Sequence, residues 1–267
     1  MMAVADMSTV PRAEPTVAIT LDVDWAPDFM IDAAARVLSE AGVRATWFIT
    51  HDSPAVQRLR RHIGLFELGW HPNFFPGSTH GATEDDVLAY CQALEPEARV
   101  VRMHGLLQSS RLLTRLRGST RVRTDVSQLL RGHAMLAVHA LPLPSGTMMR
   151  VPFWWEDDVE MCADTPVWDL AGAFADDVPG LRVLNFHPVH IALDTKALSA
   201  YEALKSQRAT LAEVTAEDVA AVRARFADQG VSAAGTARAF HDAVEWLAMR
   251  DGGCTISQLV SNAMEKP

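Results

Sequence analysis

Polar side chains that could do chemistry stand at the ends of the runs that the sequence predicts as strands. In chain order they are Asp22, Asp24, His51, His71, Arg102, His104, His187 and His190. The carboxyl ends of parallel strands meet at one edge of a sheet or barrel, where functional groups collect. We therefore expect these side chains to gather in one site, because packing alone does not require a polar residue at the end of every strand.

Asp22 and Asp24 are separated by a single residue. Residues two apart on an extended chain point to the same face, so both carboxylates are predicted to enter one site. Two like charges there cost energy unless a cation neutralises one of them. One carboxylate with two neutral imidazoles is a recognised catalytic metal set that leaves a position for water. A pair of carboxylates that caps the following helix is the structural alternative.

His71 is followed by a loop that contains another histidine. The segment 72–81, PNFFPGSTHG, is predicted to be a loop because of its Pro, Gly, Ser and Asn content. His80 lies in this loop, whose glycines give it the freedom to fold back toward His71. We expect His80 to be the third metal ligand and keep His104 as the alternative. A surface position for His80 is also open.

Strand-like and helix-like patterns alternate along the chain. The runs that predict strands are 16–23, 44–50, 65–70, 99–104 and 181–187, and helical spacing is seen over 28–41, over 53–62 and from Thr83. This alternation is typical of a parallel sheet or barrel. The middle segment, 105–152, gives no clear assignment beyond a helical SSRLLTRLR and an extended AMLAVHALPLP.

The C-terminal part, 196–267, is predicted to be mostly helical. Thr215 opens the sequence TAED, which is a capping-box pattern. The segment 232–249 repeats apolar residues at helical spacing. The tail, 254–264, is predicted to be a short extended piece followed by a final helical turn.

The length of 267 residues fits one domain, because barrels commonly take about 200–250 residues as a single unit. No internal repeat and no low-complexity linker divides the chain. We expect 16–267 to form a single domain and 1–15 to form a flexible N-terminal arm. The arm lacks the basic leader and apolar core of a signal peptide, so a cytoplasmic location is expected.

The net charge of −9 argues against nucleic acid as a partner, because the overall field would repel it. No run approaches the roughly 18 apolar residues of a membrane span, so no integral membrane segment is expected. The three cysteines are scattered and predict neither a disulfide framework nor a CxxC metal site. The sequence leaves the oligomeric state open.

Five motifs occur in an order that resembles a known family. They are TLDVDW, ATWFIT, ELGWHPN, VVRMHG and NFHPVH. This succession resembles the polysaccharide deacetylases with the NodB-homology fold, and within them the WbmS-like branch, which has similar HPNF-type and WEDD-type segments. The resemblance covers roughly 16–194. It implies an α/β fold, a distorted (β/α) barrel of about seven parallel strands with additional C-terminal helices.

The resemblance also implies a role for each matching residue. Asp22 is expected to be the catalytic base. Asp24 is expected to bind a divalent metal, with Zn as the first expectation and Mn or Co as alternatives. Arg102 is expected to pair with the base, and His187 to protonate the leaving group. Asp125 is expected to orient His187, by analogy with the fourth motif of the family.

The chain departs from the family pattern in its first two motifs. The usual first motif has adjacent acids, where this chain has the form D-x-D. The usual second motif has a second histidine four residues after the first, and this chain has Phe75 there. The second histidine ligand must therefore come from another position, for which His80 is expected before His104.

The segment VPFWWEDDV, 151–159, combines tryptophans with acids. Trp154 and Trp155 are predicted to stack on a sugar ring, while Glu156 and Asp157 accept hydrogen bonds from its hydroxyl groups. If His104 is not a metal ligand, we expect it to join this substrate-binding set. The alternative is a strand end with aromatic packing and a solvated acidic turn.

The function expected from these motifs is a metal-dependent hydrolase. It would remove an acetyl or formyl group from an amino sugar or a related glycan precursor, and so be a carbohydrate de-N-acylase. The expected substrate is a small-molecule, lipid-linked or nucleotide-linked sugar, an expectation that rests on the family analogy.

Two alternatives belong to other functional classes. A catalytically inactive sugar-binding barrel would keep the tryptophans and lack a competent base. A haloacid-dehalogenase-type phosphatase is suggested by LDVDW, but that chemistry needs a lysine before a later acidic pair. Lys196 is the first lysine of the chain, which argues against a phosphatase.

Overall fold

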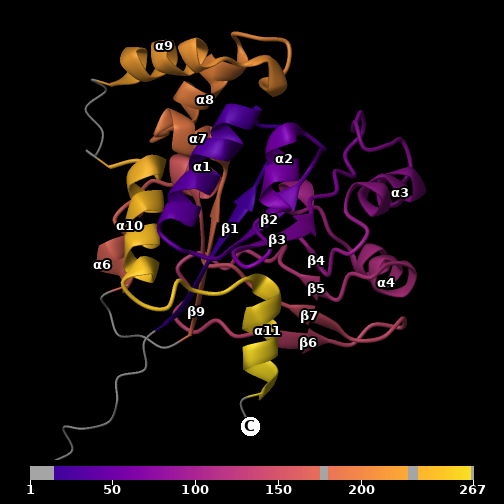
Figure 1. Cartoon of the computed structure of the whole chain (residues 1–267). Helices are drawn as coiled ribbons and strands as arrows, with labels where there is room; N and C mark the ends of the chain where they lie inside the picture. Colours follow the sequence, from indigo (N-terminus) through magenta and orange to yellow (C-terminus); the bar gives the residue numbers. More distant parts are fainter. Residues whose placement is uncertain (1–14, 175–179, 228–233, 266–267) are drawn as a thin grey trace, which may run out of the picture.

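The structure is a computed structural model that describes residues 15–174, 180–227 and 234–265. The predicted N-terminal arm, 1–15, lies outside the described residues except for Pro15. Within the described ranges a single nine-stranded sheet has the order β6-β7-β5-β4-β3-β2-β1-β9-β8. Figure 1 shows this sheet with helices packed around it.

The strands are unequal in length. They are β1 (Thr16–Asp22), β2 (Ala45–Ile49), β3 (Phe66–Trp70), β4 (Val100–Val101), β5 (Thr124–Asp125), β6 (His139–Leu141), β7 (Met148–Arg150), β8 (Trp155–Glu156) and β9 (Leu181–Phe186). Neighbouring strands pair in parallel except β6, which is antiparallel to β7. The sheet curls into a half-barrel, which confirms the predicted α/β barrel class. The edge strands β6 and β8 leave it open.

The α-helices occupy the connections and the C-terminal part. They are α1 (Asp28–Glu40), α2 (Pro54–Leu59), α3 (Glu84–Leu94), α4 (Ser110–Ser119), α5 (Asp157–Cys162), α6 (Leu170–Phe174), α7 (Pro188–Leu193), α8 (Leu198–Lys205), α9 (Ala216–Phe226), α10 (Thr236–Ala248) and α11 (Ile256–Glu265). The capping box predicted at Thr215 is present, with the side chains and backbone of Thr215 and Asp218 bonded reciprocally.

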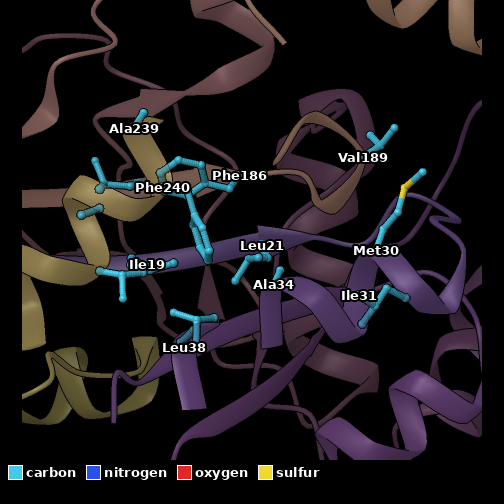
Figure 2. Packing of buried hydrophobic residues seen from close by; sticks show 14 of the residues in the cluster. Ile19, Leu21, Met30, Ile31, Ala34, Leu38, Phe186, Val189, Ala239 and Phe240 are labelled. Atoms are coloured by element: carbon cyan, nitrogen blue, oxygen red, sulfur yellow. The ribbon is translucent and has the colours of Figure 1, made fainter. Parts of the chain in front are cut away.

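The core lies between the central strands and the helices that cover them. β1 pairs with β2 on one side and β9 on the other, and all of its residues after Thr16 are buried. A strand covered on both faces needs mostly apolar residues, which explains the run VAITL. Its one polar residue, Thr20, donates its hydroxyl to the carbonyl oxygen of Leu184. Ile19 and Leu21 lie in a cluster with Leu38 of α1 and Phe240 of α10 (Figure 2).

The tail differs from its prediction. Instead of an extended piece and one turn, 256–265 forms the helix α11. Its buried residues Ile256, Leu259 and Val260 have the spacing of a helix face. The backbone N–H of Ile256 donates to Thr46 Oγ1 of β2 at 2.9 Å, so this helix is attached to the central sheet.

Candidate metal centre and active site

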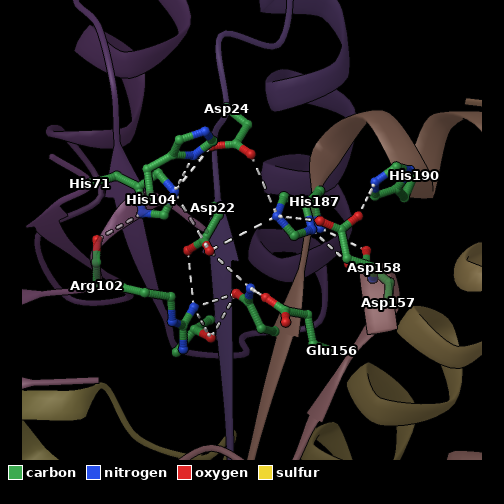
Figure 3. Close-up of polar contacts among 12 residues, drawn as sticks. Asp22, Asp24, His71, Arg102, His104, Glu156, Asp157, Asp158, His187 and His190 are labelled. Carbon is green, nitrogen blue, oxygen red and sulfur yellow. Dashed lines mark hydrogen bonds and ion pairs between the residues drawn. The ribbon is translucent and has the colours of Figure 1, made fainter. Parts of the chain in front are cut away.

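The carboxyl ends of β1, β3, β4 and β9 meet on one side of the sheet, as the strand-end pattern predicts. Figure 3 shows the side chains that gather there. Those predicted from the sequence to be catalytic or metal-binding and brought together by the structure are Asp22, Asp24, His71, Arg102, His104 and His187. His51 instead lies against Thr50, with its Nδ1 3.0 Å from Thr50 Oγ1.

The segment after β1 is a turn, whereas the spacing of Asp22 and Asp24 had predicted an extended chain with both side chains on one face. Asp24 and Trp25 have φ values of 45° and 57°, in the left-handed region that costs a non-glycine residue about 1–3 kcal/mol. The turn is held by the N–H of Trp25, which donates to Thr50 Oγ1 at 3.1 Å. Both carboxylates reach the site, but Asp24 does so because of this turn and not through strand alternation.

Three possible metal ligands converge above the end of the sheet. Asp24 Oδ1 lies 3.0 Å from His71 Nε2 and 3.1 Å from His104 Nδ1. The two ring nitrogens lie 3.2 Å from each other. His71 Nδ1 lies 2.9 Å from the carbonyl oxygen of Arg102, to which it donates, so Nε2 presents its lone pair to the site.

This donor set fits a divalent transition metal. Ligands held at about 2.0–2.1 Å by a tetrahedral ion lie about 3.3 Å from each other, close to the spacings seen here. Two imidazole nitrogens and a carboxylate oxygen that all point to one spot are better satisfied by a shared cation than by one another. Asp24, His71 and His104 are therefore the residues that would hold the metal.

His80 is not part of this group, contrary to the expectation from the sequence. Its Nε2 donates to the carbonyl oxygen of Thr50 at 2.8 Å, and its Nδ1 accepts from the N–H of Asn73 at 3.1 Å. Its ring stacks on Tyr90 with centroids 4.5 Å apart. Both nitrogens are used to hold the 72–81 loop against β2, so we assign the third ligand position to His104.

Asp22 is buried next to the metal-ligand group and is fixed on both of its oxygens. Oδ1 accepts from Arg102 Nη1 at 3.0 Å, and Oδ2 accepts from Asn185 Nδ2 at 2.9 Å. The same Arg102 nitrogen donates to Thr20 Oγ1 at 2.9 Å and to Asn185 Oδ1. This network, which includes the Asn185 that the sequence analysis missed, sets the orientation of the Asp22 carboxylate.

Arg102 is fully buried. Its guanidinium lies between two aromatic rings, 4.6 Å from the Phe48 centroid and 4.5 Å from the Phe153 centroid. Its Nε donates to the carbonyl oxygen of Val126 at 3.2 Å. Such stacking and fixed donor geometry suit arginine and not lysine. The charge of Arg102 is therefore committed to Asp22 and its neighbours.

His187 is held by Asp157 and not by Asp125. Asp157 Oδ1 lies 2.6 Å from His187 Nδ1, and Asp157 Oδ2 accepts from the backbone N–H of His187 at 2.8 Å. Asp125 instead pairs with Arg150, whose Nε lies 2.7 Å away, and accepts from Ser127 Oγ at 2.7 Å. Asp157, predicted to bind substrate, is fully buried and positions the imidazole of His187.

The electrostatics of the site favour a charged His187. Burial alone lowers the pKa of His187, but the charges of Asp158 and Asp157 and the hydrogen bond to Asp157 outweigh it, with a further contribution from Asp24. The pKa of His187 is therefore raised well above its usual value. Burial would raise the pKa of Asp24, yet its electrostatic contact with His71, its hydrogen bonds to His104 and His71, and the nearby His187 hold it well below its usual value.

The WEDD segment does not form the sugar-stacking surface predicted for it. Trp155 is 1% exposed and donates through Nε1 to the carbonyl oxygen of Val167. Trp154 is half-buried and its ring faces the Arg182 guanidinium at 5.1 Å. Trp155 is therefore part of the interior and Trp154 is half-covered, because this segment forms the edge strand β8, which pairs with β9, and not an exposed loop.

Glu156 is also buried and makes an internal contact. Its Oε1 accepts from Asn185 Nδ2 at 3.0 Å, which links it to the Asp22 network. Burial is the main reason that the pKa of Glu156 is raised to about 7; the charge of His187 lowers it and that of Asp22 raises it. Glu156 thus supports the site from within the sheet.

Two other aromatic rings border the metal-ligand group. Trp25 lies edge-on to His104 with ring centroids 5.3 Å apart, and Phe75, which is exposed, lies 6.1 Å from the same ring. Gly105 has a φ of 57° and lies so close to Phe75 that a Cβ there would meet the ring at 2.7 Å. Neither ring was predicted to lie at the site. The position of Trp25 directly after Asp24 is the sequence feature that could have indicated it.

Comparison with protein families gives the class of the chain. The model of the WbmS-like polysaccharide deacetylase family matches residues 19–205, a span that includes all of the residues of the site. The chain therefore belongs to the WbmS-like polysaccharide deacetylase family. This membership confirms the resemblance seen in the motifs and removes the basis for the phosphatase alternative.

A solved structure supports the same conclusion. A protein from Bordetella bronchiseptica, described as a candidate polysaccharide deacetylase involved in O-antigen biosynthesis, is 31% identical and matches with a TM-score of 0.69. The match covers 86% of this chain and 90% of that one. A comparison with curated proteins found no match.

More distant structures share only a general likeness. The peptidoglycan deacetylase PdaC from Bacillus subtilis is 12% identical, with a TM-score of 0.44 over 94% of this chain and 93% of that one. A pseudoenzyme of the CE4 family from Bacillus anthracis is also 12% identical, with a TM-score of 0.38 over 81% of this chain and 62% of that one.

Proposed function

We propose that this chain is a divalent-metal-dependent de-N-acylase that removes an acetyl or formyl group from an amino sugar. The observation that carries the proposal is one arrangement of side chains. A metal-ligand group of Asp24, His71 and His104 lies beside a fixed carboxylate, Asp22, and a charged imidazole, His187.

The metal would be held by Asp24, His71 and His104. When bound, a divalent ion in such a set polarises the acyl carbonyl and makes water easier to deprotonate. Two imidazoles and one carboxylate suit Zn, and Mn or Co are the alternatives that we retain.

Asp22 is proposed to act as the general base. Its Oδ2 lies 3.8 Å from His71 Nε2, a metal-ligand atom, and 3.9 Å from His187 Nε2, so a water near the metal would be within reach of Asp22. Each carboxylate oxygen has a second lone pair besides the one that accepts from Arg102 or Asn185. Asp22 can therefore take the proton of the water that attacks the acyl carbon.

His187 is proposed to act as the general acid. Its Nε2 points to the Asp22 and Asp24 carboxylates, at 3.9 Å and 3.7 Å, while Asp157 holds its Nδ1. A protonated imidazole in this position can give its Nε2 proton to the nitrogen of the departing amine. The base and the acid are 3.9 Å apart and would therefore act at the same scissile amide.

The substrate is proposed to be a free, nucleotide-linked or lipid-linked amino sugar, processed in the cytoplasm. The relative from Bordetella bronchiseptica, described in terms of O-antigen biosynthesis, supports a glycan precursor. No helix among the described residues is long and apolar enough to cross a membrane. We also propose that 16–267 form one domain, because α10 and α11 pack on the same sheet as α1.

The test is acetate or formate release by protein loaded with one metal at a time. Probes are N-acetyl- and N-formylglucosamine, each as the free sugar and as the uridine-diphosphate-linked sugar. We expect release with Zn, Mn or Co and none from a chelator-treated sample. A non-catalytic sugar-binding barrel, the remaining alternative, would bind these sugars without releasing either acid.

A further inference from the structure

A carboxylate that the proposed mechanism does not use faces the reacting atoms. Asp158 lies in the first turn of α5, and its side chain is 48% exposed, whereas that of His187 is 5% exposed. Its Oδ2 lies 3.9 Å from His187 Nε2, the nitrogen that would meet the leaving amine. Figure 3 shows Asp158 beside His187, on the side away from His71 and His104.

Asp158 is held in this position by a buried histidine from another element. His190 of α7 places its Nε2 2.7 Å from Asp158 Oδ1. The His190 ring is itself fixed, with Nδ1 3.3 Å from Thr195 Oγ1 and the Tyr201 ring packed against it in a T-shaped arrangement at a centroid distance of 4.7 Å. Because His190 already orders the Asp158 carboxylate, binding of a ligand to Asp158 does not carry the entropy cost of ordering that side chain.

The other acids at the site already have partners. Asp22 pairs with Arg102, Asp24 contacts two imidazoles, and Asp157 accepts from His187. Asp158 has one oxygen held by His190 and a second oxygen near His187 Nε2, and its side chain is 48% exposed, compared with 18% for Asp24. Its carboxylate can therefore accept a hydrogen bond from substrate.

The charge state of Asp158 decides which partner it can accept. Burial raises its pKa, but the charge of His187 and the hydrogen bond and charge of His190 prevail, and the pKa is lowered to about 2. An ionised carboxylate is an acceptor only, so its partner must donate. An anionic substituent at this position would be repelled.

We infer, on the basis of the proposed de-N-acylase function, that Asp158 is a specificity-determining residue held in place by His190. It accepts a hydrogen bond from a hydroxyl or ammonium group on C3, the ring carbon adjacent to the one that bears the acylated nitrogen. The substrate class is thus an N-acyl amino sugar with a hydrogen-bond donor at that neighbouring carbon, and sugars with an anionic substituent there are disfavoured.

The experiment measures kcat/KM for acetate release by the metal-loaded protein on four probes. They are N-acetylglucosamine, its 3-deoxy analogue, its 3-amino-3-deoxy analogue, and N-acetylmuramic acid, which has a carboxylate on the substituent at the same carbon. The variants are Asp158→Ala and Asp158→Asn. The control is Asp164→Ala, which removes an exposed acid from the loop after α5.

We expect the wild-type protein to prefer the parent sugar over the 3-deoxy analogue by about 10- to 100-fold, the usual range for one hydrogen bond to a charged group. Asp158→Ala should abolish that preference, so that the parent and the 3-deoxy analogue react at equal rates; loss of the charge beside His187 lowers the rate on every probe alike, and the ratio between the two probes is therefore the readout. Asp158→Asn should improve N-acetylmuramic acid relative to the parent. The 3-amino analogue shows whether Asp158 prefers an ammonium or a hydroxyl group. A kcat/KM for this analogue above that of the parent would mean that the ammonium group is preferred.

An equal loss on all four probes would overturn the specificity role, because a carboxylate that acted only through His187 would affect every substrate alike. An unchanged preference in Asp158→Ala would overturn it as well. Wild-type protein that deacetylates none of the probes contradicts the proposed function and with it this inference. Asp164→Ala should match the wild type throughout.

Discussion

The imidazoles of His71 and His104 face each other, with Nε2 of the first 3.2 Å from Nδ1 of the second. The Nδ1 proton of His71 is committed to the Arg102 carbonyl, so His71 presents a lone pair to its neighbour. The Asp24 carboxylate lies within 3.1 Å of both nitrogens. A shared cation satisfies all three groups at once, and this relationship between His71 and His104 is the reason to place a metal here.

The first prediction separates the two histidines considered for the third ligand. His104→Ala should lower the bound metal to well under about one equivalent, because one of three protein ligands is lost. His80→Asn, which removes the ring that holds the 72–81 loop, should keep close to one equivalent. Elemental analysis of chelator-free protein measures both. The reverse outcome would assign the position to His80.

The second prediction concerns Asp22. Asp22→Asn should keep its metal and its fold while kcat falls by about 10²–10⁴-fold, the usual loss when a general base is removed. The shape of the side chain is preserved, and the metal is held by Asp24 and the two histidines. Parallel measurements of metal content, circular dichroism and turnover check this. An active Asp22→Asn, or one that has lost its metal, would require the roles of base and ligand to be exchanged.

The third prediction concerns stability. Arg102→Met should destabilise the protein by about 3–5 kcal/mol, because it leaves the buried Asp22 carboxylate without its charged partner. Adding Asp22→Asn should restore part of that loss, since the unpaired charge is then gone. Urea unfolding of both single variants and the double variant measures the coupling. Simple additivity of the two substitutions would show that the pair is not energetically linked.

The fourth prediction concerns pH. Burial is the main cause that lowers the pKa of His80 from 6.5 to about 4, with the charges of nearby histidines adding to it and the Thr50 hydrogen bond opposing it. Because the folded pKa is the lower one, the contribution of His80 to stability is fully present above pH 6.5. It is lost as pH falls toward about 4, by at most about 3 kcal/mol.

The measurement for this prediction is the free energy of unfolding between pH 7 and pH 4. His80→Asn should be less stable at pH 7 and should show a smaller decrease toward pH 4 than the wild type. Equal slopes for the two proteins would show that His80 does not titrate in this range.

The strand ends could be predicted because β1, β2, β3 and β9 are runs rich in apolar residues that are followed by polar residues. The turn at Asp24 could not, since a left-handed aspartate is stabilised by the tertiary contact between Trp25 and Thr50 and not by a local sequence signal. Strands of two residues, such as β5 and β8, carry no periodicity to detect, whereas β4 lies inside the run 99–104 that was predicted as a strand.

The assignment of partners was harder to predict than the assignment of elements. His80 and His104 are both near His71 along the sheet edge, and only the path of the 72–81 loop decides which one turns inward. Asp157 replaced Asp125 as the partner of His187 because β8 lies next to β9, an order that the sequence does not reveal. Trp155 is buried for the same reason, because its strand β8 pairs with β9.

The metal dependence of the proposed reaction is measured by acetate or formate release from the amino-sugar probes before and after metal removal. We expect turnover with about one equivalent of Zn, Mn or Co, its loss on chelation, and its return when the metal is added back. Metal-free protein that hydrolyses the same probes at the full rate would show that Asp24, His71 and His104 do not hold a catalytic metal.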